Sequence, residues 1–277
     1  MARNIESNIW PVRGYSFPLD PGPGAQIGGM IDTGCLGTNA YRYGTMKDWV
    51  ISTTVVLADG TIVKTRNRPR KSTAGYDLTR LMVGSSRTLG LVTDAVLKVT
   101  AKTENEQIAV IAFPSTYKAV STVVDAVQQG LPFATLELLD EDTMRAVNES
   151  GYATKRWKET PTLCVKFNDT KHAVKEQMDV IGALAEEHGR ESFESSSDPK
   201  QIDVLWSGRK TALWSFIAQK RDPDDRFLSS DVAVPISRFA DIIEEAKDMV
   251  RKAGVLGSTL GHVGDGKSLP FWYCDQQ

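Results

Sequence analysis

Residues 20–44 read DPGPGAQIGGMIDTGCLGTNAYRYG, and this stretch decides how the first part of the chain is interpreted. Because glycine has no Cβ, a backbone this rich in glycine can turn tightly and approach a ligand closely. Successive backbone N–H groups, with Thr33, Thr38 and Asn39 between them, are suited to cradle a pyrophosphate. The spacing matches neither GxGxxG nor a Walker loop, so it does not support a Rossmann or P-loop domain. From these residues alone, an anion cradle and a plain irregular loop remain equally open.

The residues that follow this stretch have the pattern of a small antiparallel sheet. Residues 50–57 and 61–65 are β-branched runs on either side of Ala58-Asp59-Gly60, which predicts a hairpin. Residues 91–99 alternate apolar and polar side chains and predict a further strand.

Composition changes near residue 103, after which apolar β-rich runs alternate with amphipathic helices. Strands are predicted over residues 107–113, 133–139, 161–167, 228–234 and 256–263. Helices are predicted from Pro114 to Gly130, from the cap at 168–170 to Gly189, over 198–220, and from Pro235 to Gly254. This alternation predicts an antiparallel or mixed sheet covered by helices, which is the α+β class.

Composition and charge exclude several classes of function. The 277 residues are 41% hydrophobic and 25% charged, as in soluble globular proteins, and the net charge of −2 leaves no electrostatic footprint for a nucleic-acid partner. No apolar run approaches the roughly 18–20 residues of a transmembrane segment, and the N-terminus has no apolar region of a secretory signal. Cys35, Cys164 and Cys274 form an odd, widely spaced set, which predicts reduced thiols rather than a disulfide or metal framework.

Over a near-continuous run from about residue 17 to residue 99, the sequence strongly resembles the FAD-binding domain of FAD-dependent D-lactate dehydrogenases, flavoproteins of the vanillyl-alcohol-oxidase (PCMH/VAO) type. The segments ELLD (137–140), LWSGRK (205–210), SDVAVP (230–235) and GHVGDG (261–266) resemble the FAD-linked oxidase C-terminal domain of the same family. The resemblance implies an α+β chain, in which a partial PCMH/VAO-type FAD-binding domain precedes an α+β (ferredoxin-like) FAD-linked oxidase C-terminal domain. The expected segments are an unmatched N-terminus (1–16), the second part of the FAD-binding domain (17–103), an incomplete substrate domain (104–266) and a divergent tail (267–277).

The resemblance also implies roles for individual residues. The residues that would line the FAD are Pro23, Gly24, Gly28, Gly29, Thr33, Gly34, Gly37, Thr38, Asn39, Tyr43 and Gly44, with Gly90, Leu91 and Val92 touching it through backbone groups. Arg209 matches the arginine that grips the substrate carboxylate, a role that suits a planar guanidinium. His262 matches the first histidine of the family segment GHVGDGNFH, which serves the reacting end of the substrate and in relatives can ligate a divalent metal. Without the family, these residues alone favour a surface helix arginine for Arg209 and a structural histidine for His262.

The implied activity is FAD-dependent oxidation of a D-2-hydroxy acid, with D-lactate to pyruvate as the first candidate and cytochrome c or another acceptor taking the electrons. Arg209 would hold the carboxylate, and His262 would orient or deprotonate the hydroxyl. A mitochondrial location is implied in the same way. The alternatives are a catalytically inactive fragment, a related D-2-hydroxyglutarate or glycolate dehydrogenase, and an alkylglycerone-phosphate synthase. The segment RKSTAGYDLTRL (70–81) fits the lactate and glycolate enzymes better than the synthase.

Two departures concern the ends of the matched region. Residues 1–16 stand where the family has a glycine-rich phosphate loop, and the sequence stops before the family's downstream Glu-His-Gly motif, so a chain truncated at both ends is expected. In addition, GHVGDGNFH becomes GHVGDGKSL, with Lys267 in place of Asn and Leu269 in place of the second histidine. This change argues against a two-histidine metal site.

Two further departures lie inside the FAD-binding part. Ser86-Arg87 replaces the Glu-Gly of relatives, and an arginine forced to a positive φ would cost roughly 1 kcal/mol or more. Asp32 occupies a position that is usually small and neutral, where its negative charge would lie beside a pyrophosphate.

Overall fold

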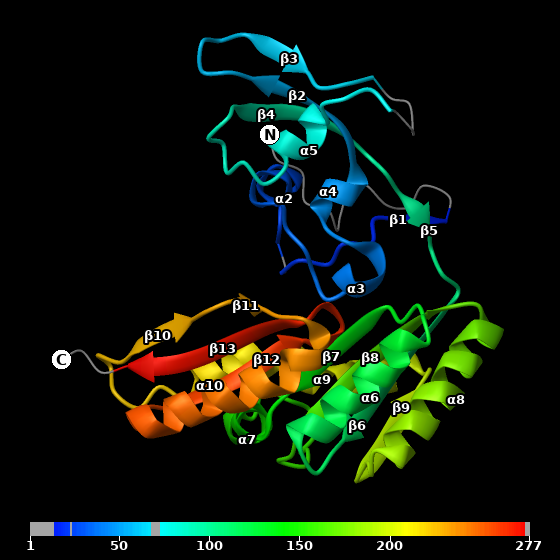
Figure 1. The fold of residues 1–277 in the computed structure, drawn as a ribbon, viewed down its shortest axis with the longest axis vertical. Coiled ribbons are helices and arrows are strands. Elements are labelled where there is room, and N and C mark those ends of the chain that lie inside the picture. Colours follow the sequence, from blue (N-terminus) through cyan, green and yellow to red (C-terminus); the bar gives the residue numbers. More distant parts are fainter. Residues whose placement is uncertain (1–13, 23, 68–72, 275–277) are drawn as a thin grey trace. The chain divides into compact units, whose positions relative to one another are not determined.

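The computed structural model describes residues 14–22, 24–67 and 73–274, shown as a ribbon in Figure 1. They form two compact units that divide between Lys102 and Thr103, one residue before the boundary expected from the sequence. Unit 1 ends at Lys102, and unit 2 begins at Thr103.

Unit 1 contains a three-stranded antiparallel sheet with the order β3-β2-β4. Its strands are β2 (Val50–Val56), β3 (Ile62–Lys64) and β4 (Leu91–Leu97). A second small sheet pairs β1 (Tyr15–Ser16) with β5 (Thr100–Ala101), and the helices are α2 (Ile27–Thr33), α3 (Ala40–Tyr43), α4 (Met46–Trp49) and α5 (Leu78–Met82). The predicted hairpin and the predicted third strand are both confirmed. The core of the unit contains Leu19, Met30, Ile31, Met46, Val50 and Val83.

Unit 2 contains one eight-stranded sheet whose paired strands are antiparallel. The strands are β6 (Asn105–Ala112), β7 (Thr135–Leu139), β8 (Thr162–Asp169), β9 (Ser192–Ser196), β10 (Arg226–Ser229), β11 (Val232–Ala233), β12 (Gly257–His262) and β13 (Lys267–Cys274). Their order is β10-β13-β12-β7-β8-β6-β9, with β11 also paired to β13.

The first half of unit 2 has a ferredoxin-like arrangement, as expected. Two helices, α6 (Thr116–Gln128) and α8 (Lys171–Glu187), connect the strands in the sequence β6-α6-β7-β8-α8-β9. The spatial order β7-β8-β6-β9 is that of the β-α-β-β-α-β motif. Strands β12, β13 and β10 then extend the same sheet beyond β7.

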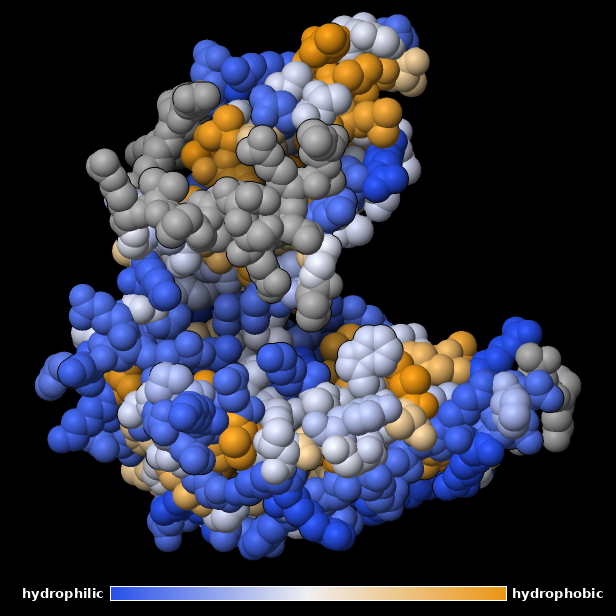
Figure 2. Space-filling model, turned by 180° about the vertical axis from the view of Figure 1, so that it is seen from behind, coloured by the Kyte–Doolittle hydropathy of each residue, from blue (hydrophilic) through white to orange (hydrophobic). Residues whose placement is uncertain are grey.

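Helices cover both faces of this sheet (Figure 1). Helices α6, α8 and α10 (Phe239–Ala253) lie on one face, and α7 (Glu141–Ser150) and α9 (Pro199–Ile217) lie on the other. The core under α7 and α9 includes Leu139, Leu205, Leu260 and a group of aromatic rings around Phe216. Figure 2 looks onto this side, and the surface of unit 2 there is mostly hydrophilic. Among the described helices, none combines the length and apolar character that crossing a bilayer requires.

The observed elements of unit 2 differ from the predicted ones in three places. Residues 267–274, expected to be a divergent tail, form β13, which pairs with both β12 and β10. The single strand predicted over residues 228–234 is two strands, β10 and β11. Helix α7 and strand β9 were not predicted, because ten residues of mixed polarity and the polar run SFESS carry little apolar periodicity.

Candidate active site

A buried carboxylate lies at the centre of the candidate site. Glu137 on β7 lies between two leucines of the strand, and its carboxylate side chain is fully buried, with an exposed fraction of 0%. Side chains alternate between the faces of a strand, so Glu137 lies on the same face as Leu139, which packs in the core under α7 and α9. The register places Cys164 of β8 opposite Glu137, and Leu260 of β12 opposite Leu139.

This carboxylate binds both residues that the sequence predicted to be catalytic. The Nε of Arg209 donates to Oε2 of Glu137 at 3.0 Å, and Nδ1 of His262 lies 2.6 Å from Oε1. The side chains of Arg209 and His262 are 13% and 12% exposed, so both are largely buried but keep a small accessible surface. Residues far apart in the sequence therefore meet at one carboxylate.

Helix α9 brings Arg209 to this point through a close contact with its neighbours. Asp198 accepts from the backbone N–H of Lys200 at 3.1 Å and Pro199 occupies the first turn, so the start of the helix was predictable. A Cβ on Gly208 would lie 3.1 Å from Nε1 of Trp157. The glycine beside Arg209 therefore lets the indole pack directly against the helix.

His262 is the last residue of β12, and the glycines around it are required by packing. A Cβ on Gly261 would lie 2.5 Å from the ring of Phe239 in α10. Gly266, after the 3-10 turn η2 (Val263–Asp265), has a φ of 67°, and a Cβ there would lie 2.1 Å from the carbonyl oxygen of Val234. The GHVGDG motif therefore positions the histidine by close backbone approach.

The surroundings of Glu137 are dry and partly charged. Burial raises the pKa of the Cys164 thiol to about 12, and Arg209 opposes that shift, so this cysteine stays protonated. Desolvation also raises the pKa of Asp265, while the nearby His262 lowers it. Lys267, paired with His262 in the β12–β13 ladder, forms an ion pair with Asp231 at 2.8 Å.

Unit 1 gathers the predicted FAD-lining residues around α2 and the loop that follows it. Gly28 and Gly29 are exposed in the first turn of α2, and a Cβ on either would meet nothing within 4 Å. In the described part of the chain, the backbone N–H groups of Ile27, Gly28 and Gly29 have no hydrogen-bond acceptor. This turn therefore presents open N–H donors without side-chain obstruction.

Other predicted FAD-lining residues use their polar groups within the protein. Thr38 Oγ1 donates to Asp20 Oδ2 at 2.5 Å, and the backbone N–H of Asn39 donates to Asp20 Oδ1 at 2.9 Å. Gly37 passes so close that a Cβ would lie 2.3 Å from Asp20 Oδ1. Thr33 Oγ1 donates to the carbonyl oxygen of Gly29 at 2.9 Å. Asp20 therefore organises the loop.

The remaining predicted FAD residues are spread over unit 1. Gly24, Gly34 and Gly44 adopt positive φ angles, and Tyr43 packs edge-on against Trp49. Further along the sequence of the unit, Gly90 packs against Val55, Leu91 is exposed, and Val92 packs against the core. Pro23 lies outside the described residues.

The two unfavourable residues of the FAD-binding part are partners. Arg87 has a φ of 67°, so the predicted backbone strain is present. Its Nε lies 2.6 Å from Oδ2 of Asp32, whose side chain is only 12% exposed. The negative charge of Asp32 is therefore compensated by Arg87. The two residues are 55 positions apart in the sequence, so their pairing was not predicted.

Comparison with known proteins places the chain in a family. The family described as FAD linked oxidases, C-terminal domain, matches residues 102–277, which is more than half of the chain. The chain belongs to the FAD-linked oxidases. A second family, described as FAD binding domain, matches residues 9–66, starting before the expected limit at residue 17.

Individual relatives of this FAD-linked oxidase are D-lactate dehydrogenases by name. The mitochondrial D-lactate dehydrogenase [cytochrome] of Kluyveromyces lactis is 45% identical over 93% of the chain and 46% of its own length. The mitochondrial D-lactate dehydrogenase [cytochrome] 1 of Saccharomyces cerevisiae is 43% identical over 93% of the chain and 45% of its own length. The chain thus spans about half the length of these curated relatives. A solved alkyldihydroxyacetonephosphate synthase has the same fold, with a TM-score of 0.72 at 18% identity over 95% of this chain and 54% of that one.

The FAD-linked oxidase chain fits a flavin cofactor better than a metal. The open N–H groups of Gly28 and Gly29 suit the pyrophosphate of FAD, because such donors favour an anion. Among the described residues, no group of three or more His, Cys, Asp or Glu side chains is arranged to hold a metal ion. His262 directs Nδ1 to Glu137 and has no second histidine beside it, since Leu269 pairs with Leu260. The residues that the structure describes around His262 therefore do not fit a divalent metal.

Glu137 is a candidate functional residue, and the sequence assigned no role to it, although it begins the ELLD segment. Its signal is a single carboxylate in the otherwise apolar strand TLELL, all of it buried. A buried charge needs a partner, so such a residue indicates a cation or a proton donor that packs against it from elsewhere in the fold. The sequence does not say which residue that is.

Proposed function

We propose that this chain carries the substrate-binding residues and part of the FAD-binding surface of an FAD-dependent D-2-hydroxy acid dehydrogenase that oxidises D-lactate to pyruvate. The observation that carries the proposal is the contact of Glu137 with both Arg209 and His262. This contact supports the proposal because a guanidinium and an imidazole that share one carboxylate would supply the two groups that a 2-hydroxy acid needs, one for its carboxylate and one for its hydroxyl proton. The names of the curated relatives support D-lactate as the substrate.

Arg209 would bind the substrate carboxylate with the end of its guanidinium. Its Nε is occupied by Glu137, which fixes the plane of the group, and its two terminal nitrogens hydrogen-bond to none of the described residues. Two parallel N–H donors match the two oxygens of a carboxylate. Because Glu137 already neutralises Arg209, the bound substrate would leave a net negative charge near His262.

His262 would take the proton of the substrate hydroxyl. A neutral imidazole that donates Nδ1–H to Glu137 keeps its lone pair on Nε2, which is the nitrogen left for the substrate. When Nε2 accepts the proton, the imidazolium lies beside the Glu137 carboxylate and is stabilised by it. FAD, when bound, supplies the acceptor for the hydride that leaves Cα. The electrons would pass on to cytochrome c or another acceptor, in a mitochondrial setting like that of the named relatives.

The visible absorption spectrum of the purified chain, followed by anaerobic addition of D-lactate, tests this proposal. Flavin bands that bleach with D-lactate but not with L-lactate are expected, and glycolate and D-2-hydroxyglutarate provide the comparison of substrates. Arg209→Lys should raise KM because a lysine cannot make the bidentate contact, whereas His262→Gln should mainly lower kcat. Bound flavin that does not bleach with D-lactate would contradict the proposal, and a chain that stays colourless after incubation with FAD would favour the inactive-fragment alternative.

A further inference from the structure

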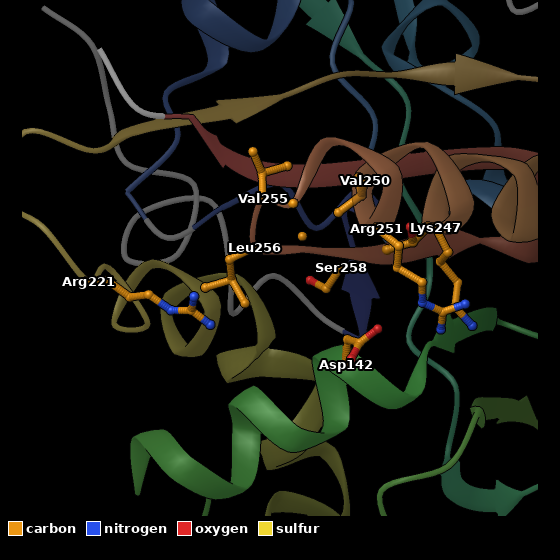
Figure 3. A pocket seen from close by; sticks show the side chains of 11 residues that line it. Asp142, Arg221, Lys247, Val250, Arg251, Val255, Leu256 and Ser258 are labelled. Carbon is orange, nitrogen blue, oxygen red and sulfur yellow. The ribbon is translucent and has the colours of Figure 1, made fainter. Parts of the chain in front are cut away.

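A cavity of about 320 Å³ lies in unit 2 and is shown from close by in Figure 3. It includes Gly257 and Ser258 at the start of β12, whereas His262 is the last residue of that strand. Its walls come from the start of β12, from α7 and α10, and from the segment after α9. None of its lining residues belongs to the Glu137 cluster, so it is separate from the candidate active site.

Positive charge predominates on the walls of this cavity. Figure 3 shows Arg221 on one side and Lys247 and Arg251 on the other. Lys247 already forms ion pairs with Glu141 at 2.5 Å and Glu244 at 3.4 Å. Arg251 lies 3.5 Å from Glu141 and 3.7 Å from Asp248, whereas Arg221 forms no ion pair with any described residue. The one acidic lining residue, Asp142, already accepts from the guanidinium of Arg145 at 2.7 Å. Arg221 is therefore the lining cation with an uncompensated charge to offer to a ligand, and Arg251 adds a guanidinium whose two ion pairs, at 3.5 and 3.7 Å, are long.

An unsatisfied hydroxyl group also lies in the cavity wall. Ser258 is only 3% exposed, and its Oγ has no hydrogen-bond partner. Buried polar groups are nearly always paired, because an unpaired one loses its hydration without compensation. Figure 3 places Ser258 between the two groups of cations. A ligand that accepts a hydrogen bond would supply the missing partner.

The backbone of β12 adds another donor beside Ser258. The N–H of Tyr273 donates to the carbonyl oxygen of Leu256, so the alternation of an antiparallel ladder turns the N–H of Gly257 away from β13. On that side β7 has already ended at Leu139. The Gly257 N–H therefore lies at the edge that the cavity occupies.

We propose that this cavity binds a small organic anion, a carboxylate or phosphate group on a short apolar skeleton. The anionic oxygens would be held by Arg221, Arg251 and the Ser258 hydroxyl. The apolar part would lie against Val255 and Leu256, which also line the cavity. Known ligand pockets span roughly 300–1,000 Å³, so a volume at the lower limit suits a molecule of only a few carbon atoms.

Calorimetric titration of the full chain at low ionic strength, with butyrate and with propyl phosphate, tests the proposal. Saturable binding of either probe is expected, and the tighter one identifies the preferred head group. Amide NMR signals of Gly257 and Ser258 should shift on addition of that probe. If neither probe saturates, the proposal is wrong.

Three variants make the test specific. Arg221→Gln should weaken binding about tenfold or more, and Ser258→Ala about threefold or more, because each removes one hydrogen bond to the anion. Ser258→Ala deletes a hydroxyl that has no protein partner, so the fold should be kept. Arg156→Gln is the matched control, since Arg156 is an exposed arginine of the same unit outside the cavity. Equal affinity in all three variants would overturn the assignment.

Discussion

Two substitutions of Glu137 should separate its effect on stability from its effect on the tautomer of His262: Glu137→Ala should mainly lower stability, and Glu137→Gln should change the tautomer. Glu137→Ala leaves the Arg209 guanidinium, only 13% exposed, without its counter-charge. Removal of one partner from a buried ion pair costs about 3–5 kcal/mol, because the remaining charge is desolvated and uncompensated. Glu137→Gln keeps the shape and one acceptor oxygen for Arg209, so its loss should be smaller, about 1.5–3 kcal/mol.

The amide of Glu137→Gln should also reverse the tautomer of His262. If the amide oxygen accepts from Arg209, the amide N–H₂ faces Nδ1 of His262, which must then act as an acceptor. The proton moves to Nε2, and the lone pair needed for a general base is lost from that nitrogen. In a serine-protease triad the corresponding amide lowers kcat by about 10⁴-fold, so a loss approaching that order is expected in the assembled enzyme.

Urea unfolding and long-range ¹H–¹⁵N NMR of the imidazole nitrogens measure the two effects without requiring flavin. The chain has three histidines, which makes the spectrum assignable with a His262→Gln variant. His188, whose Nε2 lies 2.7 Å from Asp125 Oδ2, is an internal control whose signals should not change. A Glu137→Ala variant that loses less than about 1 kcal/mol, or a His262 tautomer that is the same in Glu137→Gln, would refute the reasoning.

Three further predictions concern stability. Arg87→Gly should change the free energy of unfolding by less than about 1 kcal/mol, because relief of the φ of 67° is offset by loss of the ion pair with Asp32. In an Asp32→Asn background, Arg87→Gly should stabilise the protein by about 1 kcal/mol. Equal effects in both backgrounds would show that the two residues are not coupled. Gly266→Ala should lower the free energy of unfolding by more than about 2 kcal/mol, since its Cβ would lie 2.1 Å from a carbonyl oxygen. The control is Gly130→Ala, which has a similar φ but open space around the new Cβ, and it should lose only about 1 kcal/mol in the same urea series. Burial raises the pKa of Asp140 from 3.8 to about 7, so folding takes up a proton between these two pH values. The contribution of Asp140 to the free energy of unfolding should therefore be highest at low pH and fall as pH rises through this window, by up to about 1.4 kcal/mol per pH unit. Asp140→Asn should flatten that part of the pH profile measured by urea unfolding, and an unchanged slope would contradict the assignment.

Local structure was largely readable from the sequence because its causes are local. The Thr170 hydroxyl accepts from the N–H of Ala173 at the start of α8, and Gly254 ends α10 in the left-handed conformation. Both residue types were recognised as helix limits for those reasons. The β-branched runs of β2 and β3 likewise predicted their hairpin. Strand β9 was missed because its polar residues owe their conformation to pairing with β6.

The candidate site shows where such prediction stops. The GHVGDG and LWSGRK motifs identified His262 and Arg209 through a family resemblance, and the strand TLELL contained an unexplained carboxylate. Only the antiparallel register of β12 beside β7, with α9 packed on the same face, brings the three side chains together. Register depends on pairing between distant segments, which no single stretch of sequence encodes.

The sequence by itself determined the class of fold and the limits of most helices, since these follow from side-chain chemistry and spacing along the chain. Its resemblance to a family supplied the predicted active-site residues. The tertiary structure alone decided which charges meet. It paired Asp32 with Arg87, two residues that each looked unfavourable in isolation, and it placed Glu137 between a cation and an imidazole. The physical reason is the same in both cases: a buried charge is tolerated only with a partner, and the partner is supplied by packing rather than by proximity in the sequence.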